Sequence, residues 1–200
     1  PSAAAEALRT MLLKASTPSG WTSAVLEDFD AFLLDHAGCE RKASAAALGL
    51  VAHYPDRRAL VHECLALARE ELSHFEAVWR LIDARGLTLR PDTRSVYMER
   101  FSREFRQGSG AYFLDRLLVA AIAEARGCER FGLVGAALPP GDEREFYRDL
   151  ARAEVRHQEL YVRLAREYFP AEEVGSRLEE LLTAEARIVA ELPVRPALYA

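Results

Sequence analysis

Two copies of the pattern Glu-x-x-His constrain the fold of this chain more than any other feature. Glu71 and His74 form the first copy, and Glu154 and His157 form the second. Residues three positions apart lie on the same face of an α-helix, so each copy can direct a carboxylate and an imidazole toward one point. Di-metal carboxylate bundles use two such pairs, together with one inward-facing Glu from each of the two other helices. The pattern therefore predicts four long helices arranged around a pair of metal ions.

The composition favours helices throughout the chain. Ala, Leu, Glu and Arg dominate and are good helix formers, whereas runs of β-branched residues are almost absent. A length of 200 residues is enough for one domain with a sizeable core. We therefore predict a single all-α domain over residues 1–200, a ferritin-like four-helix bundle with additional N- and C-terminal helices.

Turn and capping residues set the expected helix boundaries. Pro55 and the pair Pro139-Pro140 interrupt the helical pattern, and Gly86 is a suitable C-cap. Asp142, with Glu145 three residues later, fits an N-cap with its capping-box partner. The helices predicted on these grounds cover residues 2–14, 21–53 (as one or two helices), 57–85, 112–137, 142–168 and 171–191, the last packed outside the bundle.

The three cysteines, Cys39, Cys64 and Cys128, are widely spaced and odd in number. This usage disfavours a disulfide scaffold and suits free thiols in a reducing cytoplasm. The sequence has no Cys-x-x-Cys pair, so a structural zinc site is also disfavoured. Neither an apolar run long enough to cross a membrane nor a secretion signal is visible, and we expect a cytoplasmic protein without a membrane partner.

One carboxylate ligand depends on a choice between Glu124 and Glu129. The tetrapeptide Gly-Cys-Glu-Arg occurs at residues 38–41 and 127–130, and this internal repeat would pair Glu40 with Glu129. Hairpin geometry favours Glu124, because side chains of two antiparallel helices meet only when they lie equally far from the turn. Glu129 is some five residues too close to the turn that follows it, which is roughly 7 Å along a helix. We therefore predict Glu124 as the ligand, with Glu129 as the alternative.

The predicted metal site combines four carboxylates and two imidazoles. These hard oxygen and nitrogen donors suit two iron or manganese ions, and the lack of thiolates disfavours structural zinc. Glu70 can serve as an outer partner of a ligand histidine, although a surface position explains it too, and His36 fits a core-edge or exposed histidine. The six candidate ligands are Glu40, Glu71, His74, Glu124, Glu154 and His157.

The segment between the second and third long helices is rich in arginine. The net charge of −5 argues against nucleic-acid binding by the whole surface, but this segment forms a local basic cluster with interleaved aromatic residues. We predict that it binds RNA; the alternative is a solvated crossover helix whose aromatics pack inward. A second basic group, Arg41, Lys42, Arg57 and Arg58, is the other candidate surface. The predicted RNA-binding residues are Arg90, Arg94, Tyr97, Arg100, Phe101, Arg103 and Arg106.

Four segments carry a likeness to known sequences that goes beyond the ligands themselves. They are Asp35–Ala43 (DHAGCERKA), Leu67–Glu76 (LAREELSHFE), Ile122–Phe131 (IAEARGCERF) and Ala153–His157 (AEVRH). In these segments the chain resembles the bacterial tRNA hydroxylases that act on 2-methylthio-isopentenyladenosine. Metal ligation alone requires neither the Cys-Glu-basic pattern nor the EARxCERF pattern, so the resemblance is more specific than Glu-x-x-His.

The resemblance implies a ferritin-like non-haem di-iron monooxygenase. Such an enzyme uses O₂ and two electrons to hydroxylate the isopentenyl group on the adenosine beside the tRNA anticodon. By resemblance, the six candidate ligands would hold two iron ions and form the catalytic site. The implied partners are the tRNA anticodon stem-loop and an external electron donor, such as a ferredoxin or a reductase.

Three other functions remain open for the same residues. A ferroxidase or iron-storage protein would assemble the same bundle into a cage, and a manganese catalase or rubrerythrin-like peroxidase would use the same ligands. The lack of rubredoxin-type Cys-x-x-Cys pairs weakens the rubrerythrin-like alternative. A non-catalytic bundle would require two coincidental Glu-x-x-His pairs and two matching upstream glutamates.

Overall fold

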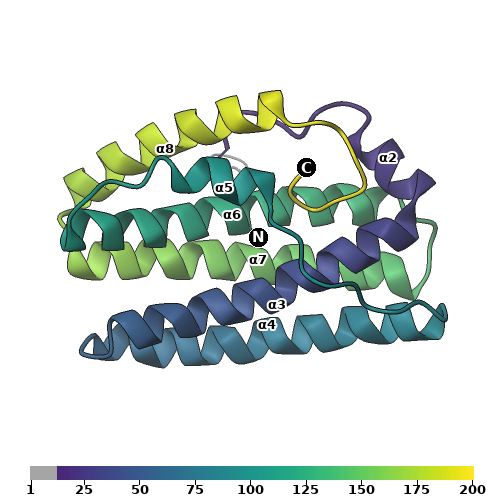
Figure 1. Cartoon of the computed structure of the whole chain (residues 1–200), viewed down its shortest axis with the longest axis horizontal. Helices are drawn as coiled ribbons and strands as arrows, with labels where there is room; N and C mark the ends of the chain where they lie inside the picture. Colours follow the sequence, from purple (N-terminus) through teal and green to yellow (C-terminus); the bar gives the residue numbers. More distant parts are fainter. Residues whose placement is uncertain (1–12) are drawn as a thin grey trace. The chain divides into compact units, whose positions relative to one another are not determined.

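The computed structural model describes residues 13–200, and all regular structure in this range is helical. The predicted all-α class is therefore confirmed for the described residues. The expected N-terminal helix over residues 2–14 falls almost wholly outside them. The helices, shown in Figure 1, are α2 (Trp21–Glu27), α3 (Phe29–His53), α4 (Arg58–Ala84), α5 (Val96–Ser102), α6 (Ser109–Ala137), α7 (Asp142–Tyr168) and α8 (Ala171–Glu191).

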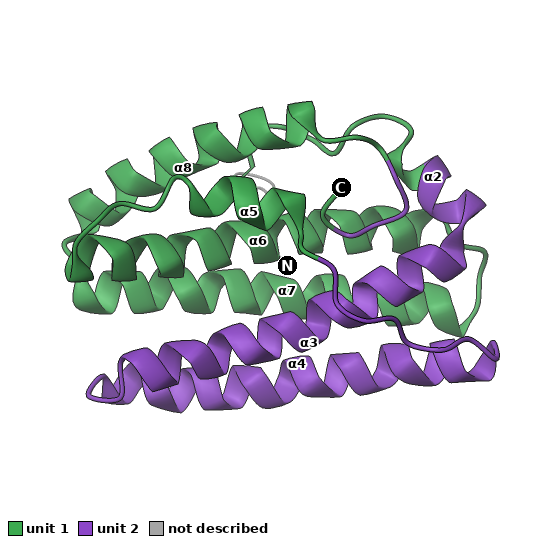
Figure 2. Cartoon of the chain, viewed as in Figure 1, with its two compact units in different colours: residues 1–22, 94–194, 199–200 green, residues 23–93, 195–198 purple. Residues whose placement is uncertain are grey.

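The chain divides into two compact units, which are coloured separately in Figure 2. Unit 1 contains the described residues up to 22, residues 94–194 and residues 199–200. Unit 2 contains residues 23–93 and 195–198. Each unit is built around one pair of long helices, α6 with α7 in unit 1 and α3 with α4 in unit 2. The expectation of a single domain stays a prediction.

Unit 2 is built on the antiparallel pair α3 and α4, which pack against each other along their length (Figure 1). Asp28 caps α3 by accepting a hydrogen bond from the backbone N–H of Ala31 at 3.0 Å. A turn at residues 54–57 separates the helices, because Pro55 cannot continue the backbone hydrogen bonding of α3. Gly86 follows α4 with a φ of 67°, a left-handed conformation that glycine tolerates. These ends lie close to the predicted boundaries.

Unit 1 is built on the antiparallel pair α6 and α7. The apolar run of α6 supplies much of the core, including the fully buried Phe113, Leu117 and Ile122. Helix α8 packs against α6 and α7, and the short helix α5 packs against α8. The predicted C-terminal helix over residues 171–191 is therefore present, and it lies outside the α6–α7 hairpin.

The start of α7 differs from the prediction. Asp142 is the first residue of the helix rather than its N-cap, and Gly141 occupies the N-cap position without a side-chain hydrogen bond. Gly141 has a φ of 155°, which glycine tolerates, so the chain enters the helix one residue earlier than expected. The first turn instead contains three acids, Asp142, Glu143 and Glu145. Their negative charges interact favourably with the positive end of the helix dipole. The predicted capping box is therefore wrong.

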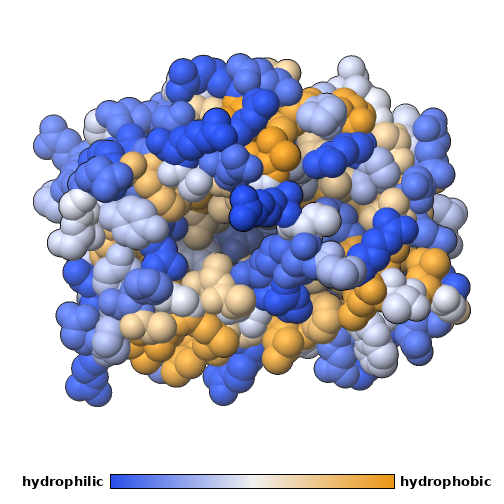
Figure 3. Space-filling view, in the orientation of Figure 1, coloured by the Kyte–Doolittle hydropathy of each residue, from blue (hydrophilic) through white to orange (hydrophobic). Residues whose placement is uncertain are grey.

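The visible face of the molecule is mostly hydrophilic, with apolar surface gathered in smaller patches (Figure 3). In unit 2, the large apolar side chains of Leu65, Leu72 and Trp79 are exposed at seven-residue spacing along α4. Residues seven apart lie on one face of a helix, so these three form a row. In the described part of the chain, no helix is both long and apolar enough to cross a membrane.

Candidate metal centre

In unit 2, α3 and α4 bring three of the predicted ligands together. Glu40 comes from α3, and Glu71 and His74 come from successive turns of α4. One ligand atom of each residue lies within 4.8 Å of those of the other two. The two glutamates are only 3% and 1% exposed, and the histidine is partly buried. We call these three residues the α3–α4 triad.

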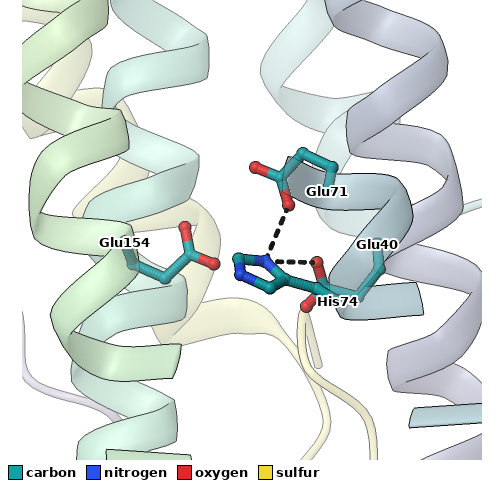
Figure 4. A group of neighbouring side chains, drawn as sticks. All are labelled: Glu40, Glu71, His74 and Glu154. Atoms are coloured by element: carbon teal, nitrogen blue, oxygen red, sulfur yellow. Dashed lines mark hydrogen bonds and ion pairs between the residues drawn. The ribbon is translucent and has the colours of Figure 1, made fainter. Parts of the chain in front are cut away.

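His74 Nδ1 is the atom around which the α3–α4 triad is arranged. It lies 3.3 Å from Glu71 Oε2 and 3.7 Å from Glu40 Oε2, and Figure 4 shows both interactions. Burial alone would lower the pKa of His74, but hydrogen bonding and charge from the two carboxylates raise it to about 9. The triad therefore favours a positive charge at this point, either a proton on the imidazole or a metal ion.

Glu40 has a second buried partner on its own helix. Nε2 of His36, one turn earlier in α3, lies 2.7 Å from Glu40 Oε1, and His36 is completely buried. Burial alone would raise the pKa of the Glu40 carboxyl, but the hydrogen bond with His36 and the nearby His74 imidazole hold it well below its usual range. Glu40 is therefore ionised at neutral pH, as a metal-binding carboxylate must be. His36 lies fully inside the core, which differs from the core-edge or exposed position that the sequence suggested.

In unit 1, α6 and α7 bring the other three predicted ligands together in the same way. Glu124 comes from α6, and Glu154 and His157 come from successive turns of α7. One ligand atom of each lies within 4.8 Å of those of the other two, and all three side chains are buried. His157 Nδ1 lies 3.3 Å from Glu154 Oε2, the same separation as between His74 and Glu71. We call these three residues the α6–α7 triad.

Glu129, the alternative to Glu124, is engaged elsewhere in unit 1. Its carboxylate accepts hydrogen bonds from the backbone N–H of Thr17 at 3.0 Å and from the Thr17 hydroxyl at 2.6 Å. Arg126 also donates a hydrogen bond to it. Five residues rotate an α-helix by about 140°, so Glu124 and Glu129 leave α6 on different faces. This arrangement agrees with the hairpin argument for Glu124. Metal binding by Glu124 stays a prediction.

The EARxCERF pattern is explained by contacts within unit 1. The buried Arg126 donates to the carboxylate of Glu185 on α8 at 2.8 and 3.0 Å, and to the carbonyl of Ala15 at 2.8 Å. The guanidinium of Arg130 lies 4.9 Å from the centroid of the Trp21 ring. These contacts tie α8 and the segment around residues 15–21 to α6. Sequence reasoning missed this role, although two arginines at helical spacing inside an apolar run were a usable signal.

The donor chemistry of both triads fits a hard divalent metal such as iron. Each triad offers two carboxylates and one imidazole, and neither includes a cysteine. Oxygen and nitrogen donors without thiolate suit iron or manganese better than structural zinc. None of the three cysteines of the chain forms a disulfide, as the sequence predicts.

Comparison with known proteins places this chain in a family. The sequence model of one family, described as tRNA-(MS2IO6A)-hydroxylase (MiaE), matches residues 5–199. This chain belongs to the MiaE family. A tRNA 2-(methylsulfanyl)-N(6)-isopentenyladenosine(37) hydroxylase from Pseudomonas putida is 38% identical, over 86% of this chain and 84% of that protein. The hydroxylase of the same name from Salmonella typhimurium is 33% identical over 68% of this chain, and the match spans only 49% of that protein.

A solved structure is similar along nearly the whole chain. It is described as protein 43 with aldehyde deformylating oxygenase activity, from Synechococcus, and is 37% identical to this chain. The match has a TM-score of 0.89 and covers 94% of this chain and 96% of that one. This similarity confirms the ferritin-like fold class predicted from the two Glu-x-x-His pairs.

The predicted RNA-binding segment of this MiaE-family member turns its aromatic side chains inward. Tyr97 and Phe101 lie one turn apart on α5 and are 1% and 0% exposed, because α5 packs against α8. The Tyr97 hydroxyl donates to Glu185 at 3.3 Å, and its ring stacks on Tyr199. Both rings are covered in this structure, which agrees with the alternative of inward-packed aromatics and offers no open face for stacking on RNA bases. RNA binding by this segment stays a prediction.

Most arginines of this segment already have acidic partners. The ion pairs join Arg100 to Glu191, Arg103 to Glu99 and Arg106 to Asp115. Arg90 and Arg94 are exposed and form no ion pair with any described residue. The positive charge available to phosphates is therefore smaller than the count of arginines in the sequence indicates.

Proposed function

We propose that this chain is a non-haem di-iron monooxygenase that hydroxylates the isopentenyl group of 2-methylthio-isopentenyladenosine beside the anticodon of tRNA. One observation carries the proposal: each long hairpin of this MiaE-family chain buries a triad of two carboxylates and one imidazole. Two Glu-x-x-His pairs and two further glutamates are the ligand set of ferritin-like di-iron centres.

The six triad residues would hold the two irons, and these supply the activation of O₂ when bound. The ligands are Glu40, Glu71, His74, Glu124, Glu154 and His157. Four ionised carboxylates carry four negative charges, which equal the positive charge of two Fe(II) ions. Binding of both metals would therefore remove most of the repulsion between buried acids.

The chain's own contribution is to hold the donor atoms in fixed positions and to shield them from bulk water. In each Glu-x-x-His pair, the carboxylate and imidazole come from adjacent turns of one helix, so their relative position varies little. The nearly complete burial of the glutamates limits contact with bulk water, which protects a reactive site from side reactions. Metal binding requires a neutral imidazole, so His74 must lose the proton that its two carboxylate neighbours favour.

The proposed reaction needs two further participants. One oxygen atom of O₂ enters a C–H bond of the isopentenyl group as a hydroxyl, and the other leaves as water. This balance requires two electrons and two protons, and an electron-transfer protein such as a ferredoxin or a reductase would supply the electrons. Because the substrate is tRNA, we infer a cytoplasmic location.

Arg90 and Arg94 are the strongest candidates for phosphate contacts within the predicted RNA-binding segment, because no acid among residues 13–200 forms an ion pair with them. A protein that neutralises phosphates releases counterions, so its affinity depends on salt. Substituting both residues by Ala should weaken binding of an anticodon stem-loop and reduce the salt slope by about 1–2. The matched control is the double substitution of Arg100 and Arg103, which are paired with acids. An equal or larger effect of the control would contradict this assignment.

The test of the main proposal uses iron-loaded protein, O₂, a reducing system and tRNA that carries unhydroxylated 2-methylthio-isopentenyladenosine. Mass spectrometry of the digested tRNA should show a nucleoside that has gained one oxygen atom. The His157→Ala variant should give no product, because it lacks one imidazole ligand. Iron-loaded protein that leaves the nucleoside unchanged under these conditions would overturn the proposal.

The Synechococcus structure favours a second candidate, an aldehyde deformylating oxygenase. Its identity to this chain, 37%, nearly equals the 38% of the Pseudomonas putida hydroxylase. The same iron-loaded protein should therefore also be given an aldehyde, with hydrocarbon and formate as the measured products. Hydrocarbon formation without tRNA hydroxylation would favour the second candidate. The iron-storage and manganese-catalase alternatives have no comparable support among the relatives described above.

A further inference from the structure

His36 is a fully buried histidine that the proposed reaction leaves without a role. It lies on α3 one turn before Glu40, with Nε2 at 2.7 Å from Glu40 Oε1. The other oxygen, Glu40 Oε2, is the one that lies toward His74 Nδ1, at 3.7 Å. The two oxygens of Glu40 are therefore distinguished by their neighbours, because each has one imidazole beside it.

The ring of His36 is held in one orientation by its surroundings. Phe32, one further turn toward the start of α3, stacks on it with ring centroids 5.8 Å apart and an interplanar angle of 29°. Phe32 is itself fully buried, so neither ring can turn without disturbing the core. An ionised carboxylate only accepts hydrogen bonds, so the Nε2–H of His36 donates a hydrogen bond to Glu40 Oε1.

The α6–α7 triad has no histidine at the corresponding position. The residue four positions before Glu124 is Ala120, whose methyl group cannot donate a hydrogen bond. The two triads supply the same three ligand types but differ in this neighbour. A role of His36 should therefore affect one metal position and spare the other.

We propose that His36 is a positioning residue for the metal bound by the α3–α4 triad: it engages Glu40 Oε1 and leaves Oε2 as the coordinating atom. The inference rests on the proposed metal centre. Without His36, the carboxylate could rotate or bind through both oxygens, and the metal would lose a preorganised ligand. Loss of such an outer hydrogen-bond partner typically lowers metal affinity about 10- to 100-fold.

The test compares three variants by anaerobic Fe(II) titration against a chelator and by Mössbauer spectroscopy of the ⁵⁷Fe-loaded protein. His36→Leu removes the donor and keeps apolar volume, whereas His36→Gln keeps an N–H that can reach Glu40. The control is His53→Leu, an exposed histidine at the end of the same helix. His36→Leu should weaken one of two iron sites about 10- to 100-fold and change one Mössbauer component. His36→Gln should restore most of the affinity, and His53→Leu should match the wild type.

Each outcome decides the inference. Two iron sites of unchanged affinity in His36→Leu, or equal weakening of both, would overturn it. Circular dichroism of the metal-free protein will show whether His36→Leu still folds. If it does not fold, His36→Gln decides. Near wild-type iron affinity at both sites in this variant supports the positioning role, and weakening of both sites contradicts it. Failure of the wild type to bind iron would instead overturn the proposed metal centre itself.

Discussion

The tetrapeptide Gly-Cys-Glu-Arg occurs in both α3 and α6, and its two glutamates have different surroundings. In α3, Glu40 lies in the α3–α4 triad, with Oε2 at 3.7 Å from His74 Nδ1. In α6, Glu129 accepts two hydrogen bonds from Thr17, and Glu124, five residues earlier, lies in the α6–α7 triad instead. An identical local sequence therefore supports a proposed ligand in one helix and a structural anchor in the other.

The arginines that end the two tetrapeptides differ in the same way. Arg41 is exposed and forms an ion pair with Asp92. Arg130 is 1% exposed and lies over the ring of Trp21. Burial of Arg130 and the nearby charge of another arginine lower its pKa to about 10, so it remains charged at neutral pH.

The distance of each tetrapeptide from the following turn explains the difference. Glu40 precedes its turn by about 14 residues, whereas Glu129 precedes its own by about 9, which is a shift of roughly 7 Å along the helix. A repeat of four residues specifies which side chains lie together on a helix. It does not specify the level of the hairpin at which they lie, and the level decides which partners they meet.

The largest expected effect is the loss of iron from the two histidine variants, and this measurement tests whether both triads bind metal. Wild-type protein should bind about two irons per chain. His74→Ala and His157→Ala should each lose at least one, because each removes the only imidazole of its triad. Iron is measured by elemental analysis after desalting. Cys64→Ala, a buried change on α4 outside the triad, serves as the control and should keep both irons. Full occupancy in both histidine variants would show that neither triad is a metal site.

The next effect tests the two glutamates of α6 directly. Glu124→Gln should lower iron affinity at least about tenfold, because an amide cannot replace the charge of a ligating carboxylate. Glu129→Gln should keep most of the iron, because Glu129 already bonds Thr17 and Arg126. Both variants are compared in the same titration. The reverse result would mean that the internal repeat, and not the hairpin level, identifies the ligand.

Arg126→Met should cause a large loss of stability. Arg126 lies only two residues from Glu124, but it belongs to neither triad. Glu185 would remain as a buried charge without its main partner, which costs about 3–5 kcal/mol of unfolding free energy. Urea unfolding followed by circular dichroism measures the change. The double variant with Glu185→Leu should recover part of the loss, because it removes the stranded charge. A single variant as stable as wild type would show that this ion pair does not anchor α8.

The smallest effects are expected on the unfolding free energy when the two arginines of the repeat are substituted one at a time. Arg130→Met should cost about 1–2 kcal/mol of unfolding free energy, because it removes a desolvated cation over an aromatic ring. Arg41→Met should cost less than about 1 kcal/mol, because exposed ion pairs contribute little. The same urea experiment applies to both. Equal losses would contradict the contrast between a buried anchor in α6 and an exposed pair in α3.

Much of the site could be predicted from the order of residues along the chain. Glu-x-x-His spacing placed Glu71 with His74 and Glu154 with His157, because residues three apart share a helix face. Counting residues from each turn placed Glu124, and not Glu129, beside the second pair. These arguments use only helix geometry and turn positions, which are local properties.

Sequence by itself determined the helices, their turns and the candidate ligand types that each hairpin gathers, because short-range periodicity and prolines encode them. Only the tertiary structure decided which polar side chains are buried and what they contact. Arg126 meets Glu185, 59 residues away, and Glu129 meets Thr17, 112 residues away. Tyr97 is buried because α8 covers α5. Such partners are distant in sequence, so their contacts depend on how helices pack, which no local pattern specifies.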